Sequence, residues 1–331
     1  MSASTFRIDR AIPSAERTEN DSTVSTGISG LRYASLTTTV PKELVHRASV
    51  SEVMLTDWER KTDDHFVLTA QWPRRHGFFT TVDDCHDPLI VAETIRQAGI
   101  LLAHAEYGVP LDHHFLMWDL AVEVKPPHML VDTAPAALTI EITCMDVKRR
   151  RGELSGLRYE ALIFRNGQLA ATGGARFTCL SPAVYQRVRA PRPESGSWSP
   201  IPLTAPLAPQ DVDRLSPTDV VLSPTGQKDQ WQLRVDTRHP VLFDHPVDHT
   251  PGMLLLEAAR QAMVAYLGRP CLPLGVTAEF LRYSELDAPC LIKAHAVSEP
   301  GSGDEERVLM TGHQEDTLVF QALVTVASPS A

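Results

Sequence analysis

The pattern Glu-x-x-Arg-Gln-Ala occurs twice in this chain, at residues 93–98 and 257–262, and the two copies lie 164 residues apart in a chain of 331. Four identities in six positions, repeated at half the chain length, indicate an internal duplication rather than two unrelated domains. We therefore expect two copies of one structural unit.

Each copy of the pattern is predicted to lie on a long helix. A proline, Pro88 or Pro251, suits the first helical turn, where its missing N–H needs no partner. Asp87 and Thr250 are the expected N-caps, and glycines shortly after the last apolar positions mark the expected ends. Both helices are apolar almost all round, which is typical of a central, buried helix.

Runs that predict strands follow each helix. They cover residues 115–123, 138–146, 158–165 and 170–180 in the first half, and 274–282, 290–297, 307–314 and 317–326 in the second. Asn166-Gly167 is a strong signal for a hairpin turn. One long helix and an antiparallel meander, present twice, predict an α+β fold of the tandem hotdog type, in which a sheet wraps each central helix.

Two segments lie outside this repeat. Residues 1–36 are rich in Ser, Thr and charged residues and are predicted to form a flexible tail. Nine of the 25 prolines fall between residues 182 and 224. Because proline at this density blocks helices and sheet ladders, we predict a linker there. The first hotdog repeat is then expected at 37–181 and the second at 225–331.

Composition excludes several classes of function. The chain has 31 Lys and Arg against 41 Asp and Glu, and this net charge of −10 argues against a nucleic-acid partner. No apolar stretch approaches 18 residues, so we expect no membrane span. Five cysteines, an odd number without a C-x-x-C pair, predict free thiols in the reducing cytoplasm.

Charged residues on the two predicted helices are the first candidates for chemistry. Glu93 and Arg96 are i,i+3 neighbours in apolar sequence, as are Glu257 and Arg260. One interpretation is an internal ion pair that fixes helix packing. The other is an active site near the helix N-terminus, where burial raises the carboxyl pKa enough for base work and the arginine holds an anion.

Histidines before the helices are candidates for proton transfer near neutral pH. His245 and His249 precede the second helix, and His86 precedes the first. The prolines in and around the stretch from His245 to His249 disfavour a shared helical face, and no H-E-x-x-H occurs, so we expect no metal site. A purely structural role is the alternative for each histidine.

The segment from His245 to Glu257 resembles the hotdog dehydratases of fatty-acid synthesis. In those enzymes the catalytic histidine lies in a loop before the central helix, and the catalytic acid lies on that helix, across the dimer. The spacing from His249 to Pro251 and Gly252 is two residues shorter here than in their pattern.

Longer segments resemble the A-factor biosynthesis family. They are VPKELVH (40–46), CHDPLIVAETIRQAG (85–99), FLMWDL (115–120), DHTPGMLLLEAARQA (248–262) and RYSELDAP (282–289). Members are tandem hotdog proteins that make precursors of butyrolactone, butenolide or furan signals controlling antibiotic production. The resemblance implies an acyltransferase that joins a β-ketoacyl group, carried as a thioester on acyl carrier protein, to a hydroxyl of dihydroxyacetone phosphate. The ester can then condense to a butenolide phosphate.

The residues fit this implied chemistry as a hypothesis. Glu257 or His245 would deprotonate the hydroxyl, and N–H groups near Gly252 would stabilise the oxyanion. Arg96 or Arg260 would hold the phosphate. Glu93 is expected to face the second-half histidine where the halves meet. Supporting positions are expected for His249, His86, Gln261 and Gln97. No cofactor is expected beyond the phosphopantetheine of the carrier protein.

A basic run stands apart at Lys148, Arg149, Arg150 and Arg151. It is either a solvated loop or a docking site for acidic acyl carrier protein.

Two other functions remain open from the residues alone. One is a tandem hotdog dehydratase or thioesterase, and the other is a non-enzymatic regulator that binds acyl or lactone signals. The absence of a helix-turn-helix pattern argues against direct DNA regulation. A fused pair is expected to be a monomer with an internal pseudo-dimer, or a homodimer.

Overall fold

The computed structural model describes residues 37–82, 84–190, 201–297 and 305–328. The predicted tail at 1–36 lies outside the described residues, as does the 191–200 part of the predicted linker.

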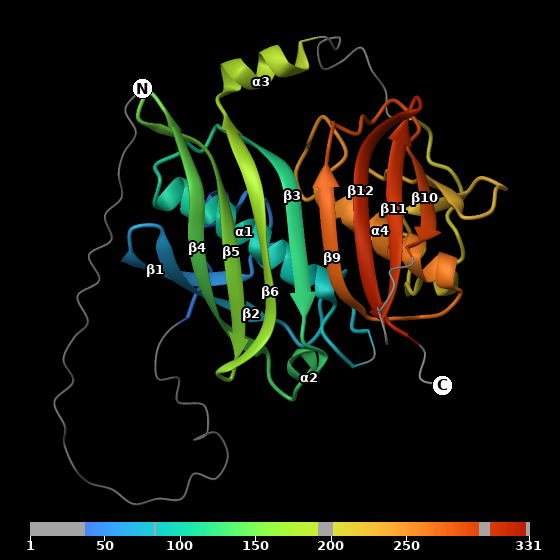
Figure 1. Ribbon diagram of the computed structural model, residues 1–331, viewed down its shortest axis with the longest axis horizontal. Helices are drawn as coiled ribbons and strands as arrows, with labels where there is room; N and C mark the ends of the chain where they lie inside the picture. The colour runs from blue at the N-terminus through green and yellow to red at the C-terminus, as the bar shows by residue number, and fades with distance from the viewer. Residues whose placement is uncertain (1–36, 83, 191–200, 298–304, 329–331) are drawn as a thin grey trace, which may run out of the picture. The chain divides into compact units, whose positions relative to one another are not determined.

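The strands of the described residues form one twelve-stranded antiparallel sheet (Figure 1). Those of the first half are β1 (Leu55–Thr62), β2 (His65–Trp72), β3 (His114–Val124), β4 (Ala136–Arg150), β5 (Glu153–Arg165) and β6 (Gln168–Leu180). Those of the second half are β7 (Leu222–Pro224), β8 (Gln230–Leu233), β9 (Pro273–Phe280), β10 (Leu291–Ala296), β11 (Glu305–Gln314) and β12 (Thr317–Ala327).

The strand order repeats itself from each edge inward. It is β1-β2-β4-β5-β6-β3 and then β9-β12-β11-β10-β8-β7, so each first-half strand has a counterpart at the same distance from the centre. The halves meet where β3 pairs with β9, for example at Leu120 opposite Ala278. We call this line the seam. The order confirms the predicted tandem hotdog fold.

Two long helices, α1 (Pro88–Ala105) and α4 (Gly252–Leu267), lie against one face of this sheet (Figure 1). The shorter helices are η1 (Lys42–Val45), η2 (Val50–Glu52), α2 (Pro126–Met129), α3 (Pro182–Arg189) and η3 (Pro209–Val212). None of the described helices is long and apolar enough to cross a membrane.

The two long helices begin differently. Asp87 caps α1 as predicted, because its carboxylate accepts a hydrogen bond from the Leu89 N–H at 2.8 Å. The predicted cap at Thr250 is wrong: α4 starts at Gly252, and no side chain caps it. Gly268 ends α4 in the left-handed conformation, with φ 66°.

The eight predicted strands are confirmed, and the Asn166-Gly167 turn has the positive φ angles, 51° and 73°, that a tight hairpin needs. The sequence prediction missed β1, β2, β7 and β8. Strand β1 lies at the edge of the sheet, where charged residues face solvent and leave little apolar alternation.

The segment 182–224 was predicted to be a linker without helices or strands. This prediction is wrong for its described part, which contains α3, η3 and β7. Three of its prolines occupy positions that need no N–H donor. Pro182 and Pro209 lie in first helical turns, and Pro224 ends the edge strand β7. A missing N–H costs no hydrogen bond at such places.

Candidate active site

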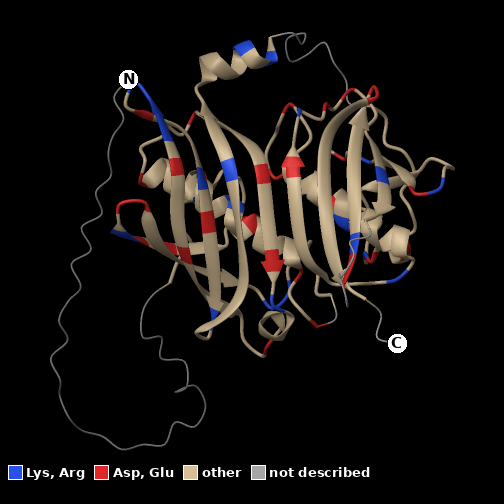
Figure 2. Ribbon diagram, in the orientation of Figure 1, with Lys and Arg blue, Asp and Glu red and all other residues tan. Residues whose placement is uncertain are grey.

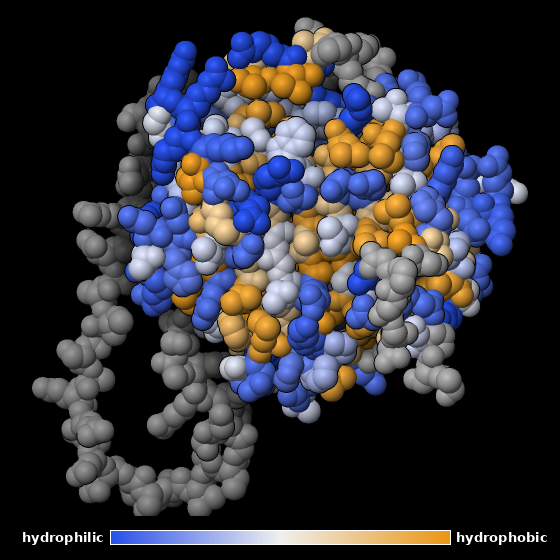
Figure 3. Space-filling model, viewed as in Figure 1, coloured by the Kyte–Doolittle hydropathy of each residue, from blue (hydrophilic) through white to orange (hydrophobic). Residues whose placement is uncertain are grey.

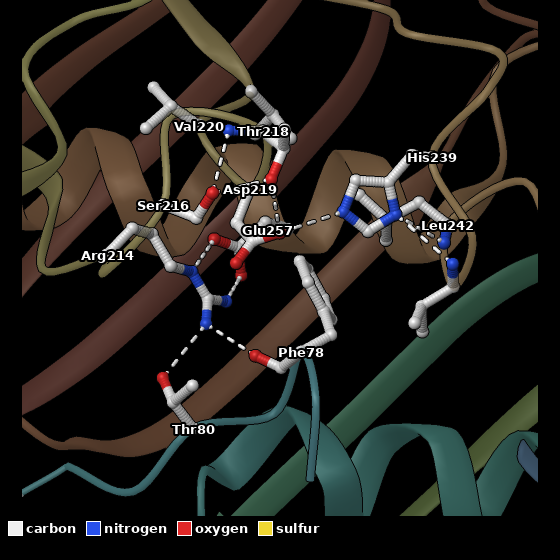
Figure 4. A network of polar contacts seen from close by, with 12 residues as sticks. Phe78, Thr80, Arg214, Ser216, Thr218, Asp219, Val220, His239, Leu242 and Glu257 are labelled. Atoms are coloured by element: carbon white, nitrogen blue, oxygen red, sulfur yellow. Dashed lines mark hydrogen bonds and ion pairs between the residues drawn. The ribbon is translucent and has the colours of Figure 1, made fainter. Parts of the chain in front are cut away.

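Each long helix carries a buried glutamate clamped between two arginines. Glu257 accepts a hydrogen bond from Arg214 Nε at 2.8 Å (Figure 4). It also accepts from Arg260 Nη2 at 2.9 Å and from the amide of Gln261. Glu93 is held likewise by Arg47 Nε at 3.0 Å and Arg96 Nη2 at 2.7 Å. We call these two clusters the glutamate clamps.

The clamps contradict the prediction that burial raises the carboxyl pKa. Burial alone would do so, but the two arginines beside each carboxyl outweigh it and lower the pKa of Glu93 and of Glu257 to about 2. Both glutamates are buried and ionised at neutral pH, so neither is suited to be the base. Arg260 is 1% exposed and paired with Glu257, which leaves it no access to a phosphate. Arg96 is likewise paired, with Glu93.

Each clamp also crosses between the halves. Arg214 Nη1 donates to the carbonyl of Phe78 in the first half at 2.8 Å, and Arg47 Nη1 donates to the carbonyl of Val241 in the second half at 3.2 Å. Glu93 therefore faces the second half through Arg47. No histidine is among the hydrogen-bond partners of Glu93 in the described residues, contrary to expectation.

The loop before α4 holds a buried histidine, His239, that sequence reasoning did not select. The Nδ1 atom of His239 accepts from the N–H groups of Val241 and Leu242, and its Nε2 lies 3.3 Å from Asp219 (Figure 4). Phe78 packs edge-on against this ring at 5.0 Å and beneath Arg214. Phe78 thus contacts both the His239 ring and the Arg214 guanidinium, and all three are buried.

A pocket of about 280 Å³ opens at the seam, beside the start of α4. Its lining residues are Phe115, Leu116, Met117, Trp118, His249, Thr250, Gly252, Leu255, Phe280, Leu281, Arg282, Tyr283 and Ser284. Most of these side chains are apolar, and Figure 3 shows apolar residues gathered over the strands near the seam. The pocket therefore combines an apolar wall with a few polar groups.

A histidine–aspartate dyad, His249 and Asp248, borders this pocket. Asp248 Oδ1 accepts a hydrogen bond from His249 Nδ1 at 2.8 Å. Burial would raise the pKa of Asp248, but hydrogen bonds from His249 and Tyr185 and the charge of Arg189 lower it. An ionised Asp248 keeps the proton on Nδ1, so Nε2 of His249 is the basic nitrogen.

The start of α4 offers hydrogen-bond donors to the pocket. The N–H groups of Gly252 and Met253 have no acceptor among the described residues, and the helix dipole favours a negative charge there. The Thr250 hydroxyl is buried and has no hydrogen-bond partner in the described parts of the chain. At the start of α1, in contrast, Pro88 has no N–H and the Asp87 carboxylate already occupies the site.

Arg282 is exposed at the mouth of the pocket. It forms no ion pair within the described ranges, so its guanidinium is available to an anion. Sequence reasoning did not select Arg282 as a site residue, although Arg282 begins the RYSELDAP segment quoted above.

The remaining predicted residues lie elsewhere. His245 is outside the pocket lining, 3.6 Å from Asp244, and burial and Arg96 lower its pKa. His86 is buried, and burial and Arg165 lower its pKa to about 4. The side chains of Gln97 and Gln261 bind the clamped glutamates and nearby backbone groups. The basic run from Lys148 to Arg151 is exposed at the β4–β5 hairpin.

Acidification is expected to destabilise the fold through the clamps. The folded pKa of Glu93 and Glu257 is about 2, below the ordinary 4.5, so their stabilisation is complete above pH 4.5 and is lost as the pH falls to 2. The loss is about 3 kcal/mol for each carboxylate. The folded pKa of His86 is about 4, below its ordinary 6.5, so His86 adds to the loss as the pH falls from 6.5 to 4. Urea unfolding at pH 7, 5, 4 and 3 measures this, and an unchanged free energy of unfolding from pH 5 to 3 would contradict it.

Fold and site together define a class: a tandem hotdog protein with a histidine–aspartate dyad and an uncapped helix start at the seam. A model of the A-factor biosynthesis hotdog domain matches residues 31–181 and 199–328. The chain belongs to the A-factor biosynthesis family.

Two relatives from Streptomyces support this membership. The chain is 54% identical over 290 residues to a 2-oxo-3-(phosphooxy)propyl 3-oxoalkanoate synthase from Streptomyces virginiae, covering 87% of this chain and 98% of that protein. It is 43% identical over 293 residues to a protein of the same name from Streptomyces coelicolor, covering 88% and 92%. A solved acyl-ACP thioesterase from Bacteroides thetaiotaomicron is similar at a TM-score of 0.47 and 11% identity, over 78% of this chain and 97% of that one.

Proposed function

We propose that this chain is an acyltransferase that joins a 3-oxoacyl group to the hydroxyl of dihydroxyacetone phosphate at the pocket beside His249. The product, a 2-oxo-3-(phosphooxy)propyl 3-oxoalkanoate, is the compound for which its relatives are named. The observation that carries the assignment of the site is the His249–Asp248 dyad beside the open start of α4.

The geometry supports direct transfer between two bound substrates. His249 Nε2 accepts the hydroxyl proton, and the oxygen attacks the thioester carbonyl carbon. Donors at Thr250 and Gly252 stabilise the resulting oxyanion. Collapse of this intermediate breaks the carbon–sulfur bond, and His249 returns the proton to the thiolate. The steps use no cofactor beyond the carrier's phosphopantetheine.

The apolar and the charged residues of the pocket lining suit different substrates. The apolar side chains, Phe115, Met117, Leu255 and Phe280 among them, suit the acyl chain. Arg282 at the mouth suits the phosphate, which an arginine binds through charge-assisted hydrogen bonds.

Acyl carrier protein is the proposed acyl donor. The basic run at the β4–β5 hairpin lies at the end of the sheet where β3 begins, as Figure 2 shows. A groove of about 420 Å³ contains Lys148 of this run and shares Trp118 with the pocket. An acidic carrier bound here would direct its flexible arm toward the seam.

The proposal is tested by whether thiol release requires the acceptor. With a 3-oxoacyl thioester, we expect release of one thiol per ester formed, and only when dihydroxyacetone phosphate is present. Mass spectrometry identifies the ester. Equal thiol release without the acceptor would indicate a thioesterase, and an enoyl thioester would indicate a dehydratase. Tight binding of a lactone without any turnover would indicate a regulator.

Replacing Arg282 by alanine is expected to raise KM for dihydroxyacetone phosphate by about 10–100-fold, because a charged hydrogen-bond partner of the phosphate is lost. We expect kcat to change much less, since phosphate binding is the same in the ground and transition states. Steady-state kinetics with the acceptor varied measures both. Arg238→Ala, at an exposed arginine outside the pocket lining, is the control. An unchanged KM in Arg282→Ala would assign the phosphate elsewhere.

A further inference from the structure

Helix α3 follows β6 of the first half and lies across the end of the sheet above β6 and β3 (Figure 1). None of its residues is fully buried. Two of them, Tyr185 and Arg189, are half-buried and reach the same residue of the second half, Asp248. This helix occupies the start of the segment that was predicted to be a linker.

The contacts of α3 occupy both carboxylate oxygens of Asp248. Tyr185 donates its hydroxyl to Oδ1 at 2.6 Å, the same oxygen that accepts from His249 Nδ1. Arg189 donates Nε to Oδ2 at 3.0 Å and Nη2 to the Asp248 carbonyl at 3.0 Å. With donors on both oxygens and on its carbonyl, Asp248 has one favoured orientation.

The surroundings of the dyad reinforce this orientation. Arg189 also forms a two-pronged ion pair with Glu285 at 2.7 and 2.9 Å, and its guanidinium lies 4.5 Å from the ring centroid of Tyr283. That ring packs edge-on against His249 at 4.8 Å. The Tyr185 ring stacks on His114 at 3.7 Å.

We infer that α3 is a positioning element for the acyl transfer, in which Tyr185 and Arg189 hold Asp248 so that it orients His249. This inference rests on the function proposed above. Neither residue touches the substrates. A base must be held within a fraction of an ångström of its working position, and partners of the orienting carboxylate commonly supply that constraint. The segment between the two halves thus contributes part of the site on the second half.

The test is a double-mutant cycle between Tyr185 and Asp248. Tyr185→Phe removes the hydroxyl but keeps the ring on His114. It is expected to lower kcat about 10-fold, with KM for both substrates unchanged, because a hydrogen bond to a charged group is lost. In the Asp248→Asn background the same change is expected to have no further effect, since Tyr185 acts only through Asp248. Arg189→Lys is the second variant. It keeps the positive charge but cannot form the paired guanidinium hydrogen bonds to Asp248 and Glu285.

Tyr107→Phe is the matched control. Tyr107 donates to Asp64 at 2.6 Å, the same kind of bond at the same length, and Tyr107 is not among the residues that line the pocket. We expect its kcat to equal that of the wild type. Circular dichroism and the thermal midpoint establish that each variant is folded.

The possible outcomes separate the two proposals. If Asp248→Asn loses activity while Tyr185→Phe and Arg189→Lys keep wild-type kcat, the role of α3 is wrong and the proposed site stands. If Tyr185→Phe lowers kcat equally in both backgrounds, Tyr185 acts independently of Asp248 and the inference is also wrong. If Asp248→Asn itself keeps wild-type kcat, the dyad does not supply the catalytic base, and both the assigned site and the role of α3 are wrong. The acyltransferase activity is judged separately, by whether thiol release requires dihydroxyacetone phosphate.

Discussion

Replacing His249 by alanine is expected to lower kcat for ester formation by about 10²–10⁴-fold, the usual contribution of a positioned general base. The ring borders the pocket and makes one hydrogen bond in the described part of the chain, to Asp248, so its removal should leave the fold intact. Ester formation followed by mass spectrometry, with KM values for both substrates, measures the effect. The loss should appear in kcat rather than KM, because proton transfer occurs only in the reaction step.

Two further histidine variants test whether the loss is specific to His249. His245→Ala is expected to have a much smaller effect, since His245 does not line the pocket. His295→Ala, at an exposed position on β10, is the neutral control. If His245→Ala were the variant that lost turnover while His249→Ala retained it, the assignment of the base would be wrong.

Replacing Glu257 by alanine is expected to lower the free energy of unfolding by about 3–5 kcal/mol, because Arg214 and Arg260 would remain buried without a counter-charge. Their side chains are each 1% exposed. Such a loss is a large part of the total stability of a typical domain, about 5–15 kcal/mol. Glu93→Ala should cost less, since Arg96 is 17% exposed and water can solvate it. Urea denaturation at pH 7 measures both.

The Glu257 variant also separates a structural role from a catalytic one. Glu59→Ala removes an exposed partner of Lys61 and is expected to leave the denaturation midpoint unchanged. If Glu257→Ala kept wild-type stability but lost turnover, Glu257 would take part in the chemistry and the interpretation of the clamps would be wrong.

The fold was largely predictable because its signals are local. The Glu-x-x-Arg-Gln-Ala repeat, the apolar helices and the Asn166-Gly167 turn each depend on neighbouring residues. Edge strand β1 escaped prediction because its outward positions are charged. The helices and the short strand within 182–224 escaped because proline was weighed by its frequency rather than by its position in each element.

The site was less predictable because its contacts join distant parts of the chain. Glu257 and Arg260 were correctly placed together on a helix, but Arg214 reaches them from 43 residues away and reverses the expected pKa shift. The dyad partner Asp248 adjoins His249 in the sequence, yet its role depends on Tyr185 and Arg189 of α3. Pairings of this kind follow from the docking of two halves, which no local pattern encodes.

The unequal starts of α1 and α4 have a consequence for how such a protein can diverge. In a pair of identical subunits, every substitution changes both helix starts at once. A single chain containing both halves has no such constraint, so Pro88 with Asp87 can seal one start while Gly252 leaves the other open. One copy can then keep a purely structural role while the other carries the catalytic site, within a continuous sheet that neither copy could complete alone.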